Sequence, residues 1–248
     1  MNGICVTGLT LGVETSGLAG AVALRRGGET VETVSIEQVG RRHAQTLVSE
    51  VDALLRRHGL TAKQLELIAV SIGPGSFTGL RVGVVFAKTL AYAVSCRVVA
   101  VDTFRAIAAA SPSDVSEVFV IADAQRGDLF VGRYIRTTGE PAEHGIECWT
   151  RAADISIEPL EAWCLRCGEI AASQPLIAVS GQAAESVCAN LSAAVRVLGP
   201  ECRSPRADLV ARLGEHQAQA AQFADLWTLE PFYLRRSAAE EKTAAVTV

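Results

Sequence analysis

One stretch of the chain has the composition of an anion-binding loop. Residues 73–81 read GPGSFTGLR and follow a β-branched run at residues 67–72 that predicts a buried strand. Gly73 and Gly75 permit positive φ and close approach of another backbone, and Ser76 is suited to cap the helix that follows. Free N–H groups at a helix N-terminus favour anions, so the stretch predicts an anion site. It is not a Walker A loop, because Gly-Lys-Ser/Thr is missing at the required spacing.

Two carboxylates stand at turns where they would be able to hold a magnesium ion. Glu14 ends an apolar run at residues 9–13, and Asp123 follows a second run at residues 117–122. Enzymes that transfer phosphoryl groups hold magnesium and align water with such carboxylates, but Asp is equally a common turn former. Both interpretations stay open. The candidate nucleotide- or anion-binding residues are therefore Glu14, Thr15, Gly73, Gly75, Ser76 and Asp123.

The helix predicted over residues 77–95 carries a stripe of small residues. Gly79, Gly83, Ala87 and Ala91 recur at every fourth position, which places them on one face. A glycine inside a helix costs about 1 kcal/mol relative to alanine, so the stripe indicates that something packs closely there. The packing partner is either the protein's own sheet or a helix of another protein, and the pattern favours neither.

Composition limits the class of protein. The chain has 248 residues, 49% hydrophobic and 20% charged, which is typical of a globular protein with a substantial core. A net charge of -4 disfavours a stand-alone nucleic-acid binder. We expect no membrane association, because no apolar run reaches the length of a membrane span and the N-terminus lacks a charged region followed by an apolar one. These features predict a cytoplasmic protein.

The cysteines and histidines do not form a recognisable metal or disulfide pattern. Seven scattered cysteines argue against a disulfide framework. Cys164 and Cys167 form a lone CxxC with no second pair and no nearby His, so a zinc site is not expected.

The elements that would position these residues predict two similar halves. In the first half the patterns predict three strands, a helix, a strand, the small-residue helix, a strand and a short helix (residues 9–13, 20–24, 30–36, 42–57, 67–72, 77–95, 97–101 and 103–110). The second half repeats three strands, a helix, a strand and a helix (residues 117–122, 129–135, 146–150, 160–167, 176–180 and 181–190). A long helix over residues 207–223 is expected to pack back on the first half, and residues 238–248 are expected to be disordered.

Two β-β-β-α-β-α halves are the arrangement of the actin-like ATPase and ribonuclease H-like fold, an α/β class. We divide the chain into an N-terminal lobe, residues 1–104, and a C-terminal lobe, residues 105–248.

Several motifs in order resemble the TsaB (YeaZ) family. The stretch LGVETS at residues 11–16 is similar to its opening strand, and residues 73–81 match its Gly-Pro-Gly-Ser-Phe-Thr-Gly-Leu/Val-Arg signature. The DAQRGDLF stretch at residues 123–130 and PFYLR at residues 231–235 resemble its later motifs. One departure is Glu14, where the family usually has Asp, and this weakens a phosphate-handling role.

The resemblance implies a non-catalytic subunit in the synthesis of threonylcarbamoyladenosine, the modified base beside the anticodon of certain tRNAs. It implies a TsaD-type transferase as partner, a TsaE-type ATPase in the assembly, a homodimer when alone, ATP or ADP only at the partner interface, and indirect or weak contact with tRNA. The histidines that bind metal in TsaD-type proteins correspond to Thr103 and Ile107 here, so no metal is expected. The alternative is a nucleotide-dependent transferase or ATPase in its own right.

The resemblance also implies that the two helices at residues 42–57 and 77–95 pair with their counterparts on the partner. The candidate interface residues are Leu47, Val51, Leu54, Leu55, Gly79, Gly83 and Ala87.

Overall fold

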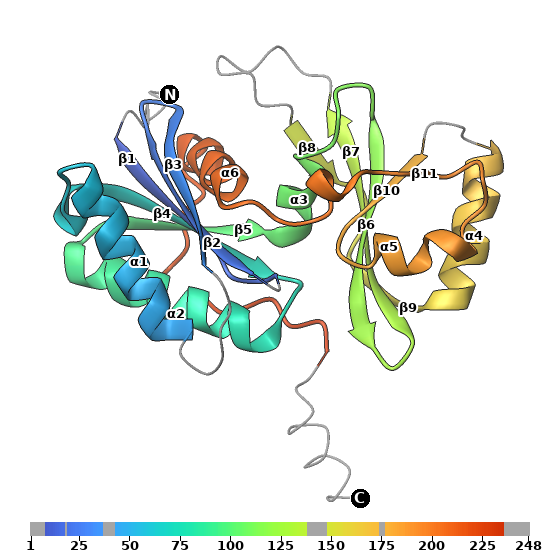
Figure 1. Cartoon of the computed structure of the whole chain (residues 1–248), viewed down its shortest axis with the longest axis horizontal. Helices are drawn as coiled ribbons and strands as arrows, with labels where there is room; N and C mark the ends of the chain where they lie inside the picture. Colours follow the sequence, from blue (N-terminus) through green and yellow to red (C-terminus); the bar gives the residue numbers. More distant parts are fainter. Residues whose placement is uncertain (1–7, 18, 37–42, 138–147, 174–176, 236–248) are drawn as a thin grey trace, which may run out of the picture.

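The computed structural model describes residues 8–17, 19–36, 43–137, 148–173 and 177–235. These residues form two mixed sheets with helices packed beside them (Figure 1). The first sheet has the strand order β3-β2-β1-β4-β5. The elements of the first half are β1 Leu9–Glu14, β2 Gly20–Arg26, β3 Glu29–Ile36, α1 His43–Arg57, the 3-10 helix η2 Ala62–Gln64, β4 Leu65–Gly73, α2 Phe77–Val94, β5 Arg97–Asp102 and α3 Thr103–Ala108.

The second sheet repeats this order as β8-β7-β6-β10-β11, with β9 also paired to β7. In the first sheet β1 pairs antiparallel with β2 and parallel with β4, and in the second sheet β6 pairs antiparallel with β7 and parallel with β10. This duplication confirms the predicted α/β class with two related halves. The elements of the second half are β6 Glu117–Gln125, β7 Asp128–Thr137, β8 Cys148–Arg151, β9 Ser156–Pro159, α4 Leu160–Ser173, β10 Ile177–Ser180, α5 Ala184–Val187, η3 Cys188–Asn190, β11 Arg196–Val197, η4 Pro200–Cys202 and α6 Ala207–Gln219.

The second half departs from the predicted pattern in three places. Strands β9 and β11 were not predicted, because four and two residues are too short to show a period. The helix expected over residues 181–190 consists of α5, which has four residues, followed by the 3-10 helix η3. The strand predicted at residues 146–150 lies partly outside the described residues, and the predicted tail at 238–248 lies wholly outside them.

Helices cover both faces of the first sheet (Figure 1). Ile68 and Val70 of β4 enter the core beneath α1 and α2, whereas Leu67 and Ala69 enter the core beneath α6. This alternation follows from the two-residue period of a strand. Helix α6 approaches the sheet closely, because a Cβ on Gly12 would overlap the carbonyl oxygen of Ala207.

A buried ion pair fastens α6 to the sheet. Arg25 of β2 donates from Nε to Oε2 of Glu215 on α6 at 3.0 Å, and the two side chains are 7% and 8% exposed. Arg25 also donates to Thr30 Oγ1 at 2.7 Å and to the carbonyl oxygen of Gly28. Because each charge is removed from water, each depends on the other for its solvation.

Helix α3 and the residue before it join the two halves. Asp102 caps α3 by accepting hydrogen bonds from the N–H groups of Phe104 and Arg105, and its Oδ2 accepts from the hydroxyl of Tyr134 on β7 at 2.6 Å. Burial raises the pKa of Asp102, and burial and the Asp102 charge raise the pKa of Tyr134. Phe104 and Ile107 pack in a hydrophobic core of the second half of the chain. The proposed lobe boundary at residue 104 therefore falls inside a helix that touches both sheets.

Helix α2 corrects one expectation about membranes. Its 18 residues have a mean hydropathy of 1.3, so by length and composition it is apolar enough to cross a membrane. Core helices of folded proteins satisfy the same criterion, and Leu80, Val84 and Ala87 of α2 are buried against the first sheet.

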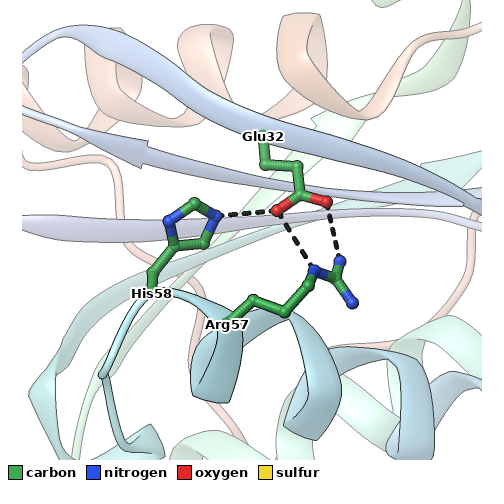
Figure 2. Close-up of polar contacts among 3 residues, drawn as sticks. All are labelled: Glu32, Arg57 and His58. Atoms are coloured by element: carbon green, nitrogen blue, oxygen red, sulfur yellow. Dashed lines mark hydrogen bonds and ion pairs between the residues drawn. The ribbon is translucent and has the colours of Figure 1, made fainter.

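The edge strand β3 is tied to α1 by a surface cluster (Figure 2). Glu32 Oε1 accepts a hydrogen bond from Arg57 Nη2 at 2.8 Å, and its Oε2 accepts one from Arg57 Nε at 3.4 Å and lies 2.7 Å from Nε2 of His58. The hydrogen bonds from Arg57, followed by that from His58, lower the pKa of Glu32. The cluster is partly exposed, so it contributes to the position of the C-terminal end of α1 more than to stability.

The buried ion pair generates a stability prediction. Replacing Glu215 by Met leaves the Arg25 charge buried and unpaired, so the free energy of unfolding should fall by about 3 kcal/mol. The control is Asp52→Asn, which breaks the exposed Asp52–Arg56 pair and should cost less than about 1 kcal/mol. Denaturant unfolding measures both variants, and equal losses would contradict a structural role for the buried pair.

Candidate functional site

The turn after β1 holds a buried carboxyl group. Glu14 is 1% exposed, and its Oε1 accepts hydrogen bonds from the backbone N–H and the hydroxyl of Ser16, each at 2.5 Å. Burial raises the pKa of Glu14 in spite of these bonds. The carboxyl group therefore supports its own turn, which differs from the exposed magnesium ligand considered from the sequence.

The N-terminal part of α2 presses against this same turn. A Cβ on Gly79 would overlap the carbonyl oxygen of Thr15, and a Cβ on Gly83 would overlap Thr15 Oγ1. Thr15 Oγ1 donates to the carbonyl oxygen of Gly79 at 2.8 Å. Packing inside the chain therefore accounts for the close approach at Gly79 and Gly83, and contact of this stripe with a helix of another protein stays a prediction.

Three backbone donors of the predicted anion site are engaged within the chain. The N–H of Gly73 donates to Thr103 Oγ1 at 3.0 Å, the N–H of Ser76 to the carbonyl oxygen of Ser16 at 2.8 Å, and the N–H of Gly79 to Ser76 Oγ at 3.3 Å. The last bond confirms Ser76 as the N-cap of α2. These three donors are satisfied by the protein and are not directed at an anion.

Asp123 supports a different turn from the one that Glu14 supports. It is exposed on β6, and its Oδ1 accepts a hydrogen bond from the N–H of Gln125 at 2.7 Å. This bond shapes the turn between β6 and β7, which is the turn-forming alternative that the sequence left open. Glu14 and Asp123 each bind their own turn.

A C-terminal segment fills the space beside the loop. We call residues 231–235 the C-terminal strap. The N–H of Phe232 donates to the carbonyl oxygen of Ile72 at 2.7 Å, and a Cβ on Gly73 would lie 2.8 Å from the carbonyl oxygen of Phe232. Tyr233 stacks on Phe77 with ring centroids 4.7 Å apart. The close backbone approach predicted at Gly73 is therefore made by the chain's own strap.

The strap also reaches the second half. Arg235 donates to the carbonyl oxygen of Ala124 at 2.6 Å and pairs with Asp128 at 2.5 Å. The four motifs at residues 11–16, 73–81, 123–130 and 231–235 thus meet in one region. Sequence reasoning identified these motifs but missed the role of Arg235. Only the contacts of the fold reveal it.

The positions that correspond to the metal-binding histidines lie inside the protein. Thr103 is 2% exposed and accepts the hydrogen bond from Gly73. Ile107 is 1% exposed and lies in the hydrophobic core of the second half of the chain. Within the described residues no group of three His, Cys, Asp or Glu side chains is arranged to hold a metal ion.

The predicted interface residues require a correction. Leu47, Val51, Leu54 and Leu55 of α1 and Ala87 of α2 are all less than about a tenth exposed, and each belongs to the core between the helices and the first sheet. Gly83 is also buried. The helical period located the apolar face of α1 correctly, but that face covers the protein's own sheet.

The opposite faces of the two helices expose large apolar side chains. We define the outer face as Val48 of α1 with Val85 and Tyr92 of α2, which are 55%, 61% and 68% exposed. Trp227 packs edge-on against Tyr92 with ring centroids 5.9 Å apart. A small pocket opens between the N-terminal parts of the helices, lined by Thr15, Gly20, Ile36, Leu47, Ser76, Thr78, Gly79 and Val82.

The contact between Gly83 and Thr15 can be tested by adding a methyl group at position 83. Gly83→Ala should lower the free energy of unfolding by about 1–3 kcal/mol, because the new methyl group overlaps Thr15 Oγ1. Adding Thr15→Ala removes that atom, so the double variant should lose less than the sum of the single changes. In the control Gly168→Ala, the nearest atom is 3.6 Å away, and stability should rise by up to about 1 kcal/mol. Additive losses would contradict the contact.

The buried carboxyl of Glu14 predicts a pH effect. Its folded-state pKa lies above the ordinary value of 4.5, so the folded state binds the proton more tightly than the unfolded state. The free energy of unfolding should therefore fall as pH rises from about 4.5 through the folded-state pKa. Glu14→Gln should remove this dependence and be more stable than the unchanged protein at pH above neutral. A pH series of denaturant titrations showing parallel curves for both proteins would refute this.

Comparisons with known proteins indicate the family of this chain. Residues 31–243 match the protein-family model described as "TsaD: tRNA N6-adenosine threonylcarbamoyltransferase". The tRNA threonylcarbamoyladenosine biosynthesis protein TsaB of Bacillus subtilis is 33% identical over 124 residues, covering 50% of this chain and 54% of the relative. The TsaB protein of Escherichia coli is 28% identical over 128 residues, covering 51% and 54%. The chain thus spans about half the length of the curated relatives it matches.

A solved structure extends the likeness of the fold over nearly the whole chain. YeaZ from Pseudomonas aeruginosa superimposes with a TM-score of 0.72 at 23% identity, covering 92% of this chain and 100% of the other. At this identity the superposition establishes the fold alone. Because the family model covers well over half of the residues and curated TsaB proteins match the same chain, this protein belongs to the family of the TsaD model and, within it, to the TsaB (YeaZ) family.

Proposed function

We propose that this protein takes part in the synthesis of threonylcarbamoyladenosine in tRNA as a non-catalytic subunit. In this proposal it docks through the outer face of α1 and α2 onto a TsaD-type transferase and holds that enzyme in its working conformation. The observation that carries the proposal is a pairing of two features. Three backbone donors of the loop where ligand chemistry was expected bind atoms of the chain itself, and the outer face exposes apolar side chains.

The engaged N–H groups of the loop and the buried carboxyl group of Glu14 support a non-catalytic role. A phosphate would need N–H groups directed at it, but those of Gly73, Ser76 and Gly79 bind other atoms of the chain. A magnesium ion would need accessible carboxylate oxygens, but Glu14 is buried with a raised pKa that favours the neutral acid. A nucleotide, in our proposal, binds only where the partner completes the site.

The outer face supports docking. Val85 and Tyr92 are seven positions apart and lie on one side of α2, with Val48 on the neighbouring helix α1. Large apolar side chains gathered on one face are typical of protein interfaces. Arg81 lies one turn before Val85 and is exposed, which gives the face a polar rim.

Further partners follow as parts of the same proposal. In the absence of the transferase the outer face would associate with a second copy of the chain, giving a homodimer. A TsaE-type ATPase would join the assembled pair, and the whole would work in the cytoplasm, where its tRNA substrate is found.

Docking can be tested with a matched pair of substitutions. Val85→Asp places a charge in the centre of the outer face, and it should weaken binding to the TsaD-type protein at least about tenfold. Leu165→Asp makes the same change at a side chain that is 73% exposed on α4 in the other half, and it should leave binding unchanged. Calorimetric titration measures both affinities. Equal affinities for the two variants would place the interface elsewhere.

A reconstituted modification assay separates the subunit from an independent enzyme. With the transferase present, Leu165→Asp should support modification and Val85→Asp should not. The isolated chain should show no ATP turnover, and Asp123→Ala should retain modification because Asp123 only shapes its own turn. ATP hydrolysis by the isolated chain that Asp123→Ala abolishes would favour the alternative of a nucleotide-dependent enzyme.

A further inference from the structure

The turn between β6 and β7 holds two residues in an unfavourable backbone conformation. Gln125 and Arg126 have φ values of 64° and 60°, and Gly127 follows with 83°. Positive φ suits glycine, but in a residue with a side chain it brings Cβ close to the following carbonyl oxygen. Non-glycine residues keep this conformation where the surrounding structure holds them in it. The turn therefore depends on contacts that the rest of the chain supplies.

Arg235 of the C-terminal strap supplies three of these contacts. Its guanidinium group donates to the carbonyl oxygens of Ala124 at 2.6 Å and Gln125 at 3.2 Å, and it pairs with Asp128 at 2.5 Å. A local bond from the N–H of Gln125 to Asp123 Oδ1 at 2.7 Å adds to them. One side chain from a distant part of the sequence thus holds the turn on both of its strands.

The strap is firmly attached to the first half of the chain. The N–H of Phe232 donates to the carbonyl oxygen of Ile72 at 2.7 Å. Shortly before the strap, Leu229 is buried in the core beneath α1 and α2, and its carbonyl oxygen accepts a hydrogen bond from Lys88 Nζ at 3.0 Å. Opening this attachment would expose a buried apolar side chain and break a backbone hydrogen bond, so we expect it to persist.

The attachment to the second half is weaker. It involves the contacts of Arg235 and the side chain of Leu234, which is only partly buried against a core of the second half. The side chains of Arg235 and Asp128 are 24% and 26% exposed. A partly exposed ion pair contributes little net free energy, because water competes for both charges. The strap should therefore release the second half before it releases the first.

We propose that the strap is a reversible clasp between the two halves. In the closed form, Arg235 holds the β6–β7 turn at positive φ and fixes the second half against the first. In the open form, Arg235 leaves, residues 125 and 126 relax to negative φ, and the second half gains freedom to turn about α3, which touches both sheets. Relaxation of the turn offsets part of the cost of breaking the ion pair, so the two forms lie close in free energy.

A double-mutant cycle on the full chain tests whether the clasp holds the turn. Gln125 is exposed, and Asn tolerates positive φ better than Gln, so Gln125→Asn should raise the midpoint of thermal unfolding by about 2 °C. Arg235→Met opens the clasp and should lower the midpoint. Because the turn has then already relaxed, Gln125→Asn should give no increase in the Arg235→Met background. An equal increase in both backgrounds would overturn the proposal.

The matched control is Arg166→Met, which removes another partly exposed ion pair of the second half. Arg166 pairs with Glu158 at 2.8 Å, and their side chains are 43% and 23% exposed. This change should also lower the midpoint of thermal unfolding, but it leaves the clasp closed. Gln125→Asn should therefore keep its full increase in the Arg166→Met background. Loss of the increase there would show that it depends on stability in general, which would contradict the clasp.

Nuclear magnetic resonance measures the opening itself. In Arg235→Met the backbone shifts of Gln125 and Arg126 should move from left-handed values to those of negative φ, whereas the shifts of Phe232 should stay. Residual dipolar couplings of β4 and β10 should fit one alignment in the unchanged chain, and those of β10 should become smaller in Arg235→Met. Unchanged turn shifts, or one shared alignment in Arg235→Met, would contradict the clasp. These measurements use the isolated chain, so their outcome is independent of the proposed docking.

Discussion

The contact between the glycines of α2 and the turn after β1 fixes the first half of the molecule. Gly79 and Gly83 let the helix lie directly on Thr15, and a hydrogen bond from the Thr15 hydroxyl to Gly79 holds the two together. Everything near the predicted anion site follows from this approach. The turn closes over Glu14, and the N–H groups of Gly73 and Ser76 bind partners within the chain.

The same approach orients α2 and thereby the surface it presents. Since the glycine side faces the turn and the sheet, Val85 and Tyr92 must face outward. Phe77, at the first turn of the helix, is then positioned to receive Tyr233, and the strap continues to Arg235 and the β6–β7 turn. A single chain of contacts therefore runs from the docking helix to the second half, in parallel with the Asp102–Tyr134 bond beside α3.

Local signals in the sequence predicted what is local in the structure. The strand before Gly73, the cap at Ser76 and the two-fold repeat of elements were predicted, because strand propensity, capping and turn chemistry depend on near neighbours. The predicted interface residues of α1 are buried within the chain for a physical reason. Apolar periodicity identifies the face that leaves water, and for Leu47 and Leu54 that face turns toward the protein's own sheet. Thr15 and Gly79 are 64 residues apart in the sequence, and Arg235 is about 110 residues from the two carbonyl groups that it binds. No local pattern encodes contacts over such separations.

The central claim is that the chain binds the loop N–H groups of Gly73, Ser76 and Gly79 itself and works through the outer face of its helices. Hydrogen exchange on the full-length protein, alone, with ATP and with the TsaD-type partner, tests it most directly. We predict that the amides of Gly73, Ser76 and Gly79 exchange slowly in the free chain and that ATP does not change them. The partner should slow exchange in α1 and α2. Rapid exchange at those three amides in the free chain, with protection gained only on adding ATP, would contradict the account.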